Sequence, residues 1–501
     1  MKRILAIVLD AAAPELIEQW TDDNSLPNLR QLREKGAYGR LRSVAEFLAE
    51  AAPYAFFTGR NPAATGLHFY AMWDRESMQV RPPDRDWLAY EPFWRTFRGA
   101  GPRAVVLDPS NVYPPEPFNG AEIIGWATHD ALAPFQSYPP ELAQWVRRQF
   151  GASLLPDERY GLISKREFMA EYRRMIALNE RFADLCEALM AREPWDLFLA
   201  SMISLHHGGH RLWSPSNIRE RLTEAEQTAL GDMLRAVYVA ADRAIGRLVT
   251  AAGSDAIVMV LSLHGMGPNA SRGSVLPEMV RRITGDTQRP DAISRARLAI
   301  PTERRHAVKS RLPYQIKRSI TRHWRTREHD WTRTLAFSLF SDTQGWIRVN
   351  LKGREAGGIV EPGASYDALC SEIRDGLHSF VDADTGEPIV MDAFRPADLF
   401  EGGHVDMLPD LVVRWSESPA AMHRAVTSPS YGTIPWPTPG RNPEGRSGSH
   451  RGQGLLVAAG PGIRQGCIEN GHILDLAPTI LSLLDQPIPA GMEGKPLRLL
   501  Q

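Results

Sequence analysis

Runs of aliphatic residues alternate with longer amphipathic stretches along most of the chain. The aliphatic runs predict five strands, at residues 4–9, 104–107, 196–203, 256–262 and 454–459. Continuous Val, Ile and Leu runs bounded by polar turns are typical of strands that are buried on both faces of a parallel sheet. The amphipathic stretches predict helices at residues 14–20, 29–35, 165–190 and 223–250. This alternation favours an α/β sandwich with a mainly parallel central sheet.

Two later regions break the alternation. Residues 284–335 predict a basic helical cap, either a solvated surface or a lid that attracts an anionic substrate. Its cations include Arg304, Arg305, Lys309, Arg311, Lys317, Arg318, Arg322, Arg325 and Arg327. Residues 336–430 predict a smaller mixed α/β subdomain, because strand-like segments stand at 345–351 and 409–415. The core would therefore comprise residues 1–283, and the chain would return to it at 431–501.

Composition excludes few classes of protein. The 501 residues carry a net charge of −1, with 43% hydrophobic and 23% charged residues, which is ordinary for a soluble globular protein. No field of one sign argues for nucleic acid, and no apolar stretch is long enough to predict a membrane span. The N-terminal apolar run is short and reads as a strand rather than a signal peptide. Three scattered cysteines favour a reducing, cytoplasmic location, and the oligomeric state stays open.

Polar residues capable of chemistry follow three of the predicted strands. Asp10, His206 and His264 each come just after an apolar run. Ligands of open α/β sheets bind outside the carboxyl ends of the strands. His210 follows His206 by four residues, and His450 comes after a loop rich in Pro, Gly and Ser. Asp10, His206 and His264 are therefore the first candidates for a site.

Four blocks of the chain resemble the type I phosphodiesterase/nucleotide pyrophosphatase family of the alkaline phosphatase superfamily, in the family's order. AIVLDAAAPELI resembles the opening strand with its metal-binding Asp, and FFTGRNPAATG resembles the nucleophile region. SLHGMGP resembles the Asp-His-Gly-Met turn, and GSHRGQGLLVAAGPGI resembles the block with the last metal-binding His. The resemblance covers nearly the whole chain and implies an alkaline-phosphatase-like fold and a metal-dependent hydrolase.

In that family, two divalent metals clamp a phosphoryl group while a Ser or Thr attacks it. The resemblance implies a principal metal site made of His206, His210 and His450, where His206 stands at a position that the family fills with Asp. Three imidazoles and an open position suit zinc, with iron or manganese as alternatives. They also resemble the arrangement that lowers the pKa of a bound water to about 7.

Two other family positions depart from the pattern. Ala49 stands at the nucleophile position and has no hydroxyl, and Leu263 stands at a ligand position and cannot bind a metal. The second metal site therefore keeps only Asp10 and His264. These two residues would form a residual metal site, or they would act as catalytic acid/base groups.

Four further residues are candidates for supporting roles. Glu46 or Glu50 could replace the missing ligand of the second site. Lys352 and Arg354 lie in a family-like block and are either structural or substrate-binding, since an Arg can hold a carboxylate or phosphate with two hydrogen bonds.

Together these features favour a metal-dependent enzyme that acts on a small anionic substrate, with hydrolysis of a phosphoester or related group as the default reaction. Two alternatives stay open. One is a lyase, isomerase or oxidative enzyme at the same metal, and the other is a ligand-binding protein without turnover. Nucleic acid and membranes are not expected partners.

Overall fold

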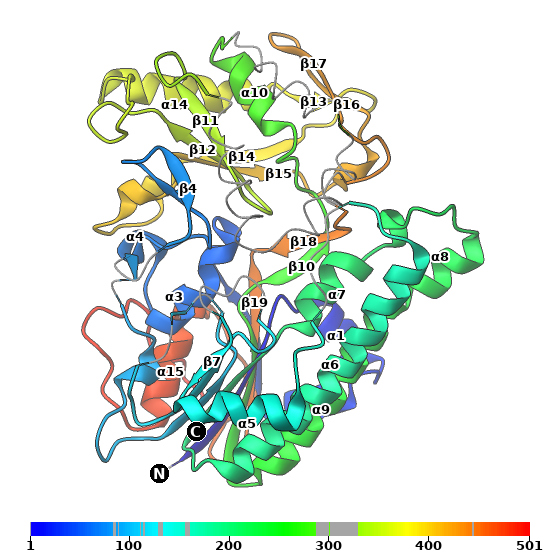
Figure 1. The fold of residues 1–501 in the computed structure, drawn as a ribbon, viewed down its shortest axis with the longest axis vertical. Coiled ribbons are helices and arrows are strands. Elements are labelled where there is room, and N and C mark those ends of the chain that lie inside the picture. The colour runs from blue at the N-terminus through cyan, green and yellow to red at the C-terminus, as the bar shows by residue number, and fades with distance from the viewer. Residues whose placement is uncertain are drawn as a thin grey trace.

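A nine-stranded sheet forms the centre of the larger lobe, which occupies the lower part of Figure 1 together with both termini. The strand order is β20-β2-β19-β9-β1-β8-β5-β6-β7. The strands are β1 Arg3–Leu9, β2 Ala37–Arg42, β5 Ala104–Leu107, β6 Gly120–Ile124, β7 Gln136–Tyr138, β8 Leu197–Met202, β9 Ala256–Ser262, β19 Gln453–Ala459 and β20 Gly466–Cys467. The structure is a computed structural model that describes residues 2–500 apart from 84–86, 89, 111, 114–115, 129–133, 156–160, 287–299, 301–328 and 443–444.

Five neighbouring strands of this sheet, β9, β1, β8, β5 and β6, run parallel. Every residue of β8 and β9 is buried, because helices cover both faces of the sheet. This confirms the predicted α/β sandwich with a mainly parallel central sheet. β19, one of the five predicted strands, is an exception to the parallel arrangement, since it pairs antiparallel with both β9 and β2. A continuous apolar run signals burial on both faces and carries no information about strand direction.

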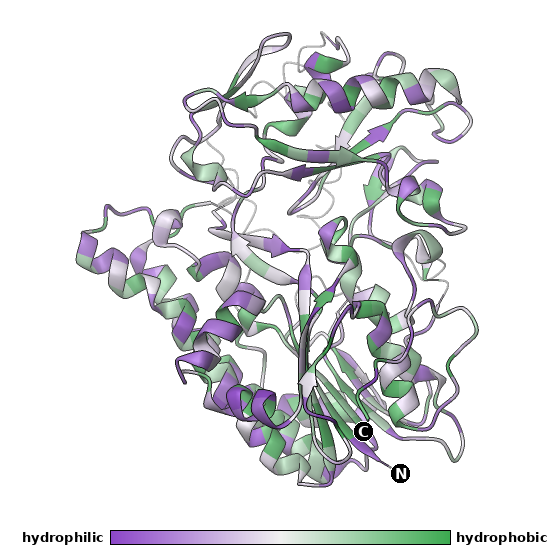
Figure 2. Ribbon diagram, turned by 180° about the vertical axis from the view of Figure 1, so that it is seen from behind, coloured by the Kyte–Doolittle hydropathy of each residue, from purple (hydrophilic) through white to green (hydrophobic). Residues whose placement is uncertain are grey.

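Amphipathic helices cover the two faces of the sheet, with their apolar sides turned inward (Figure 2). The helices of this lobe are α1 Pro14–Asp22, α2 Pro27–Lys35, α3 Ala52–Thr58, α4 Pro62–Thr65, α5 Pro140–Phe150, α6 Lys165–Arg192, α7 Ser204–Leu212, α8 Glu224–Gly231, α9 Met233–Ala252 and α15 Leu476–Leu483. A capping box between Ser164 and Glu167 fixes the start of α6. The helix predicted at 223–250 is two helices, α8 and α9, which meet at Asp232.

The smaller lobe, at the top of Figure 1, has its own sheet and its own hydrophobic cluster. The sheet has the order β11-β12-β15-β14. The elements are α10 Leu276–Ile283, β11 Ala336–Leu339, β12 Gly345–Val349, α14 Ala364–His378, β14 Val390–Phe394 and β15 Leu411–Trp415, with a second sheet of β13 Val381–Asp382, β16 Ala425–Ser428 and β17 Gly432–Pro435. α10 packs in the same cluster as α14, so this lobe draws on residues before the predicted cap.

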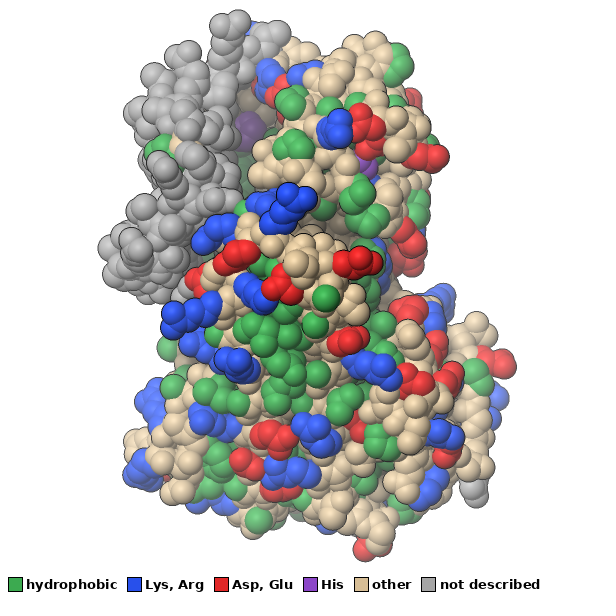
Figure 3. Space-filling view, turned by 90° about the vertical axis from the view of Figure 1, so that its right-hand side faces the viewer, with side chains coloured by type: hydrophobic (Ala, Val, Ile, Leu, Met, Phe, Trp, Pro, Cys, Tyr) green, Lys and Arg blue, Asp and Glu red, His purple; other side chains and the backbone are tan. Residues whose placement is uncertain are grey.

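The predicted basic cap at 284–335 lies outside the described residues except at 284–286, 300 and 329–335. On the face shown in Figure 3, basic and acidic side chains of the described residues are interspersed. None of the described helices has the length and apolar character needed to cross a membrane.

Two small two-stranded sheets complete the fold. β3 Met72–Asp74 pairs with β4 Gln79–Arg81. β10 Gly265–Pro268 pairs antiparallel with β18 Gly448–Arg451. In Figure 1 the second of these sheets lies with α7 at the top of the large sheet, just below the smaller lobe. It joins a segment that follows β9 to the segment that precedes β19.

Candidate metal centre

Three adjacent parallel strands deliver the first polar residues of the site to one edge of the sheet. β1 lies between β9 and β8, and its register pairs Leu9 with Met202 and Val8 with Leu261. The residues that follow these strands therefore emerge at the same edge. Asp10 follows β1, α7 follows β8, and His264 follows β9, as the strand pattern predicts.

α7 presents two histidines on one face. His206 and His210 are separated by one helical turn, so their side chains lie one above the other. The helix packs tightly against β10 at Gly209, where an added Cβ would stand 2.6 Å from Cγ of Met266. The backbone N–H of Ser447 donates to the carbonyl of His210 at 2.8 Å. The absence of a side chain at Gly209 is what allows α7 to approach β10 so closely.

β18 brings the last histidine into the site. His450 pairs with Met266 of β10, and β10 begins directly after His264. The rings of His450 and His264 have centroids 4.6 Å apart, and those of His450 and His206 are 4.9 Å apart. The pairing of β10 with β18 is thus what places a residue from the end of the chain beside residues from its first half.

The hydrogen bonds of α7 orient two nitrogen lone pairs toward each other. His210 Nδ1 lies 2.9 Å from the carbonyl oxygen of Gly448, which can only accept, so Nδ1 carries the proton and Nε2 has a free lone pair. His206 Nδ1 lies 3.2 Å from Asp10 Oδ2, a contact that favours the same tautomer. The two Nε2 atoms lie 3.1 Å apart. Such a pair is stable when a cation shares both lone pairs, and histidine ligands are commonly held from behind in this way.

Burial keeps the ring nitrogens in the neutral form that binds metals. Desolvation is the main cause that lowers the pKa of His210 well below its ordinary value, and the Arg446 charge adds to it. Desolvation also lowers the pKa of His450, followed by the nearby His264. Both ring nitrogens of His450 are buried, with no hydrogen-bond partner among the described residues. Buried polar atoms are normally satisfied, so this donor set fits a divalent metal of the zinc type.

The structure places His264 closer to the principal histidines than the sequence implies. Ring nitrogens of His206, His264 and His450 lie within 4.8 Å of one another. Asp10 stands between His206 and His264, since its Oδ1 lies 3.7 Å from His264 Nε2. His210 adjoins the same group through His206. The predicted principal and residual sites therefore form one cluster of four histidines and one carboxylate.

The two positions that lack family chemistry lie in apolar surroundings. Ala49 begins the short 3₁₀ helix η2 Ala49–Ala51 and is fully buried, and Leu263 is 3% exposed. Both belong to the hydrophobic cluster that also contains Leu48. Hydrocarbon therefore occupies the places where the resemblance implies a nucleophile and a ligand.

The two candidate replacement ligands differ in environment. Glu46 pairs with Arg414 at 2.9 Å and its side chain is 44% exposed. Both carboxylate oxygens of Glu50 are buried, with no hydrogen-bond partner among the described residues. Neither carboxylate is among the potential metal-ligand atoms that lie within 4.8 Å of one another, which belong to His206, His264 and His450.

Two charged residues beside the histidines escaped the sequence reasoning. Arg446 pairs with Asp342 at 3.2 Å, and both side chains are largely buried. Arg446 is close enough to lower the pKa of both His210 and His450. Its position four residues before His450 is the one signal that could have found it. Asp342 belongs to a distant segment and has no comparable signal.

The predicted substrate-binding cations are engaged within the smaller lobe. Lys352 pairs with Glu361 at 2.5 Å, with both side chains exposed. Arg354 donates to both carboxylate oxygens of Asp410, each at 2.7 Å, and to Glu355 at 2.9 Å. These contacts favour the structural role that the sequence left open for Arg354.

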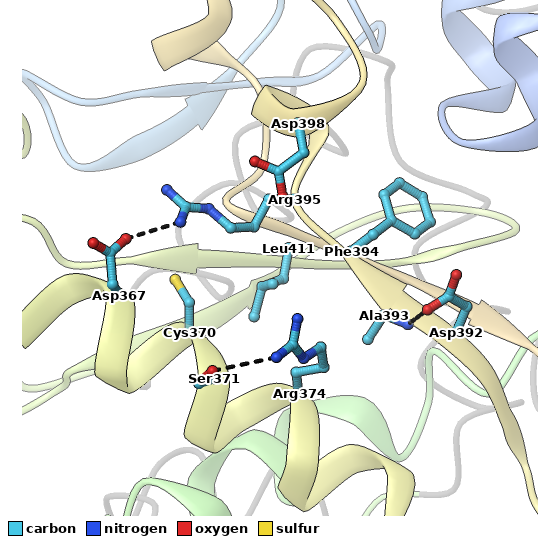
Figure 4. Close-up of a pocket in the computed structure, with 10 residues that line it drawn as sticks. All are labelled: Asp367, Cys370, Ser371, Arg374, Asp392, Ala393, Phe394, Arg395, Asp398 and Leu411. Atoms are coloured by element: carbon cyan, nitrogen blue, oxygen red, sulfur yellow. Dashed lines mark hydrogen bonds and ion pairs between the residues drawn. The ribbon is translucent and has the colours of Figure 1, made fainter. Parts of the chain in front are cut away.

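A cavity of about 540 Å³ lies between α14 and β14 in the smaller lobe, and no residue of the histidine cluster lines it (Figure 4). Arg395 donates to Asp367 at 2.8 Å across it, and Arg374 donates to Ser371 at 3.3 Å. Burial raises the pKa of Cys370 to about 11, so the thiol is not activated. The cavity therefore offers less chemistry than the histidine cluster.

Comparison with known proteins supports the resemblance. The family model for type I phosphodiesterase/nucleotide pyrophosphatase matches residues 4–424, which include α7, Asp10 and His264. No curated protein sequence matches the chain significantly.

Comparison with solved structures finds similar chains at low sequence identity. Phosphonoacetate hydrolase from Sinorhizobium meliloti 1021, in complex with phosphonoacetate, is 12% identical with a TM-score of 0.52, over 95% of this chain and 94% of that one. Human ectonucleotide pyrophosphatase/phosphodiesterase 5 is 12% identical with a TM-score of 0.49, over 97% and 96%. Its murine counterpart, solved as an inactive form in complex with AMP, is 12% identical with a TM-score of 0.49, over 98% and 96%. On the extent of the family match, this chain belongs to the type I phosphodiesterase/nucleotide pyrophosphatase family.

Proposed function

We propose that the chain is a metal-dependent hydrolase of small anionic phosphoesters or phosphonates. His206, His210 and His450 would be its principal metal ligands, with His264 and Asp10 beside them. The observation that carries the proposal is the pair of Nε2 atoms 3.1 Å apart, each held by an acceptor behind it. The two buried nitrogens of His450, which lack partners among the described residues, support it. Zinc is the favoured ion, because the donors are imidazoles.

A divalent ion held there would stabilise the charge on phosphoryl oxygens and make a water molecule easier to deprotonate. The protein's own groups have separate tasks. Asp10 orients the His206 ring from behind, as carboxylates commonly do for histidine ligands. The adjacent Asp10 and His264 would accept a proton from the attacking water. Because Ala49 has no hydroxyl, water would attack the phosphorus directly and no covalent phosphoenzyme would form at that position.

The membership of the family supports hydrolysis as the default reaction. The phosphonoacetate present in the Sinorhizobium meliloti structure suggests phosphonates as probes beside phosphoesters. Ligand binding without turnover is the second candidate. The apolar packing of Ala49 and Leu263 favours it, because the family's nucleophile is absent there.

One experiment separates these functions. The protein is stripped with a chelator, reloaded with zinc, manganese or iron, and assayed against phosphomonoesters, phosphodiesters and phosphonates. We expect turnover that His450→Gln abolishes, together with loss of metal. His378→Gln is the matched control, since His378 is exposed at the end of α14. Metal binding with no turnover of any probe would favour the ligand-binding protein, and failure to bind metal would refute the metal-dependent hydrolase.

A further inference from the structure

Glu50 is a buried acid that the histidine cluster does not explain. It directly follows Ala49 in η2, and both of its carboxylate oxygens are buried without a hydrogen-bond partner among the described residues. An ionised carboxylate in such a place loses its hydration, and no side chain of the described residues donates to it in return. A neutral carboxylic acid fits the same place with far less penalty.

Two charged neighbours act on Glu50 in opposite directions. Burial and the charge of Asp342 raise the pKa of Glu50 to about 8, whereas Arg446 acts the other way. Arg446 also pairs with Asp342 at 3.2 Å, and its effect on the pKa of Glu50 is smaller than that of Asp342. Burial and the neighbouring Asp342 carboxylate thus favour the protonated form of Glu50.

Three contacts bring the segments around this acid toward the segment that carries His450. Gln344 donates to the carbonyl of Ala45 at 2.9 Å, which ties the 342–344 segment to the segment that leads into η2. Ser449, the residue before His450, donates to Thr343 at 3.3 Å. The pairing of Arg446 with Asp342 is the third contact. The segments that carry Glu50, Asp342 and His450 thus converge.

We propose that Glu50 is a further catalytic residue, the general acid that protonates the leaving group during ester hydrolysis. This inference rests on the proposed function. As the water oxygen bonds to phosphorus, the bond from phosphorus to the leaving oxygen breaks, and that oxygen keeps the electron pair. The leaving oxygen takes the proton of Glu50 and departs as an alcohol. The proton released by the water passes to Asp10 or His264 and from there to solvent, and solvent returns one proton to Glu50.

A role as a second-metal ligand fits Glu50 less well. Among the described residues, the potential ligand atoms that lie within 4.8 Å of one another belong to His206, His264 and His450. The carboxylate of Glu50 is not part of this group. Arg446 also places a permanent positive charge next to the carboxyl. A cation would be repelled there, whereas a proton carried as a neutral acid is not.

The test compares Glu50→Gln with Glu46→Gln in metal-loaded protein. Glutamine keeps the shape of Glu50 but has no acidic proton. Glu46 ends the preceding short 3₁₀ helix, Val44–Glu46, and is solvent-exposed and paired with Arg414. Esters with alkyl leaving groups need a proton, whereas nitrophenyl esters do not. We expect Glu50→Gln to lower kcat for alkyl esters by about 10²–10⁴-fold and for nitrophenyl esters only slightly. Metal content should be unchanged, and Glu46→Gln should behave like the wild type.

A second measurement does not depend on activity. Infrared spectroscopy at pH 7 should show a protonated carboxyl band that Glu50→Gln removes and Glu46→Gln retains. Absence of that band, loss of metal in Glu50→Gln, or an equal loss of rate for both ester types would overturn the acid role. A wild-type protein that hydrolyses no ester overturns the proposed function instead, so the two failures are distinguishable.

Discussion

The Nε2 atoms of His206 and His210 face each other at 3.1 Å across one turn of α7. Each ring is held from behind, His206 by Asp10 and His210 by the carbonyl of Gly448. Neither ring can turn away without losing its acceptor. The pair is therefore preorganised for a shared cation, and substitutions at the metal centre can be predicted from it.

Metal content should reflect a single cluster. Because the four histidines and Asp10 lie in one spatial cluster, we expect about one zinc ion per chain in protein purified without added metal. Elemental analysis after gel filtration measures it. A reproducible second ion per chain would show that Asp10 and His264 hold a metal of their own.

His206→Ala should remove most of the metal, because it takes away the residue that adjoins Asp10, His210 and His450. His206→Asp should keep more of it, since a carboxylate restores the ligand type that the family uses there. Any hydrolysis should still change, because a carboxylate lowers the net charge of the metal site. Competition with a chromogenic chelator compares the affinities. Equal affinity in the wild type and His206→Ala would argue against this site.

Ala49→Ser should not create a phosphoenzyme or raise hydrolysis. A hydroxyl at this position enters a hydrophobic cluster that also contains Leu263, whose side chain cannot bind a metal. Mass spectrometry of acid-quenched protein after incubation with a phosphodiester is the check. A trapped phosphoserine at position 49 would show that the second half of the family site still functions.

Arg354→Ala should destabilise the smaller lobe without affecting metal content. It leaves the carboxylate of Asp410 buried without its main cation, which typically costs about 3–5 kcal/mol of unfolding free energy. Lys352→Ala breaks an exposed pair and should cost less than about 1 kcal/mol. Urea unfolding of both variants measures the difference. If Arg354→Ala instead left stability intact and raised the KM of a substrate, the substrate-binding role would be supported.

Metal-free protein should lose stability as the pH falls. The pKa values of His210 and His450 lie well below the ordinary 6.5 in the folded chain, mainly through burial. Above about pH 7.5 both states leave these rings neutral, so they contribute no pH dependence. Below about pH 6.5 the unfolded chain takes up protons that the folded chain refuses.

The unfolding free energy should then fall by up to about 1.4 kcal/mol per pH unit for each of these histidines. Urea unfolding of chelator-treated protein between pH 7.5 and 5.5 tests this slope, and His450→Gln should reduce it. A stability that stays constant over this range would indicate that the rings are already charged in the folded protein.

Much of the large lobe could be predicted from the sequence, because its strands are buried on both faces. The predicted runs at 104–107 and 256–262 coincide with β5 and β9. β2 was not predicted, since its alternating pattern in AYGRLR gives only a weak apolar signal. The predicted helix at 223–250 contained a break at Asp232 that helical periodicity alone does not reveal.

The site residues, like the strands, could be predicted only where a clear apolar pattern marks the element that positions them. Asp10, His206 and His264 could be found because each follows a recognisable strand. Their arrangement could not, because the distance from His264 to His450 depends on the pairing of β10 with β18, and neither strand has an apolar pattern. The Asp342–Arg446 pair was hidden for a related reason. Contacts between loops distant in sequence leave no periodic trace.

β19 has a consequence for how the chain is made. This strand lies between β9 and β2, yet it is translated only after the whole smaller lobe. Until it emerges from the ribosome, β9 and β2 have exposed edges that invite pairing with other chains. The nascent chain would therefore need protection over a long interval, and the smaller lobe would fold before the sheet closes. Because His450 immediately precedes β19, the metal could be captured only at that closing step, and its uptake during synthesis would mark the completion of the molecule.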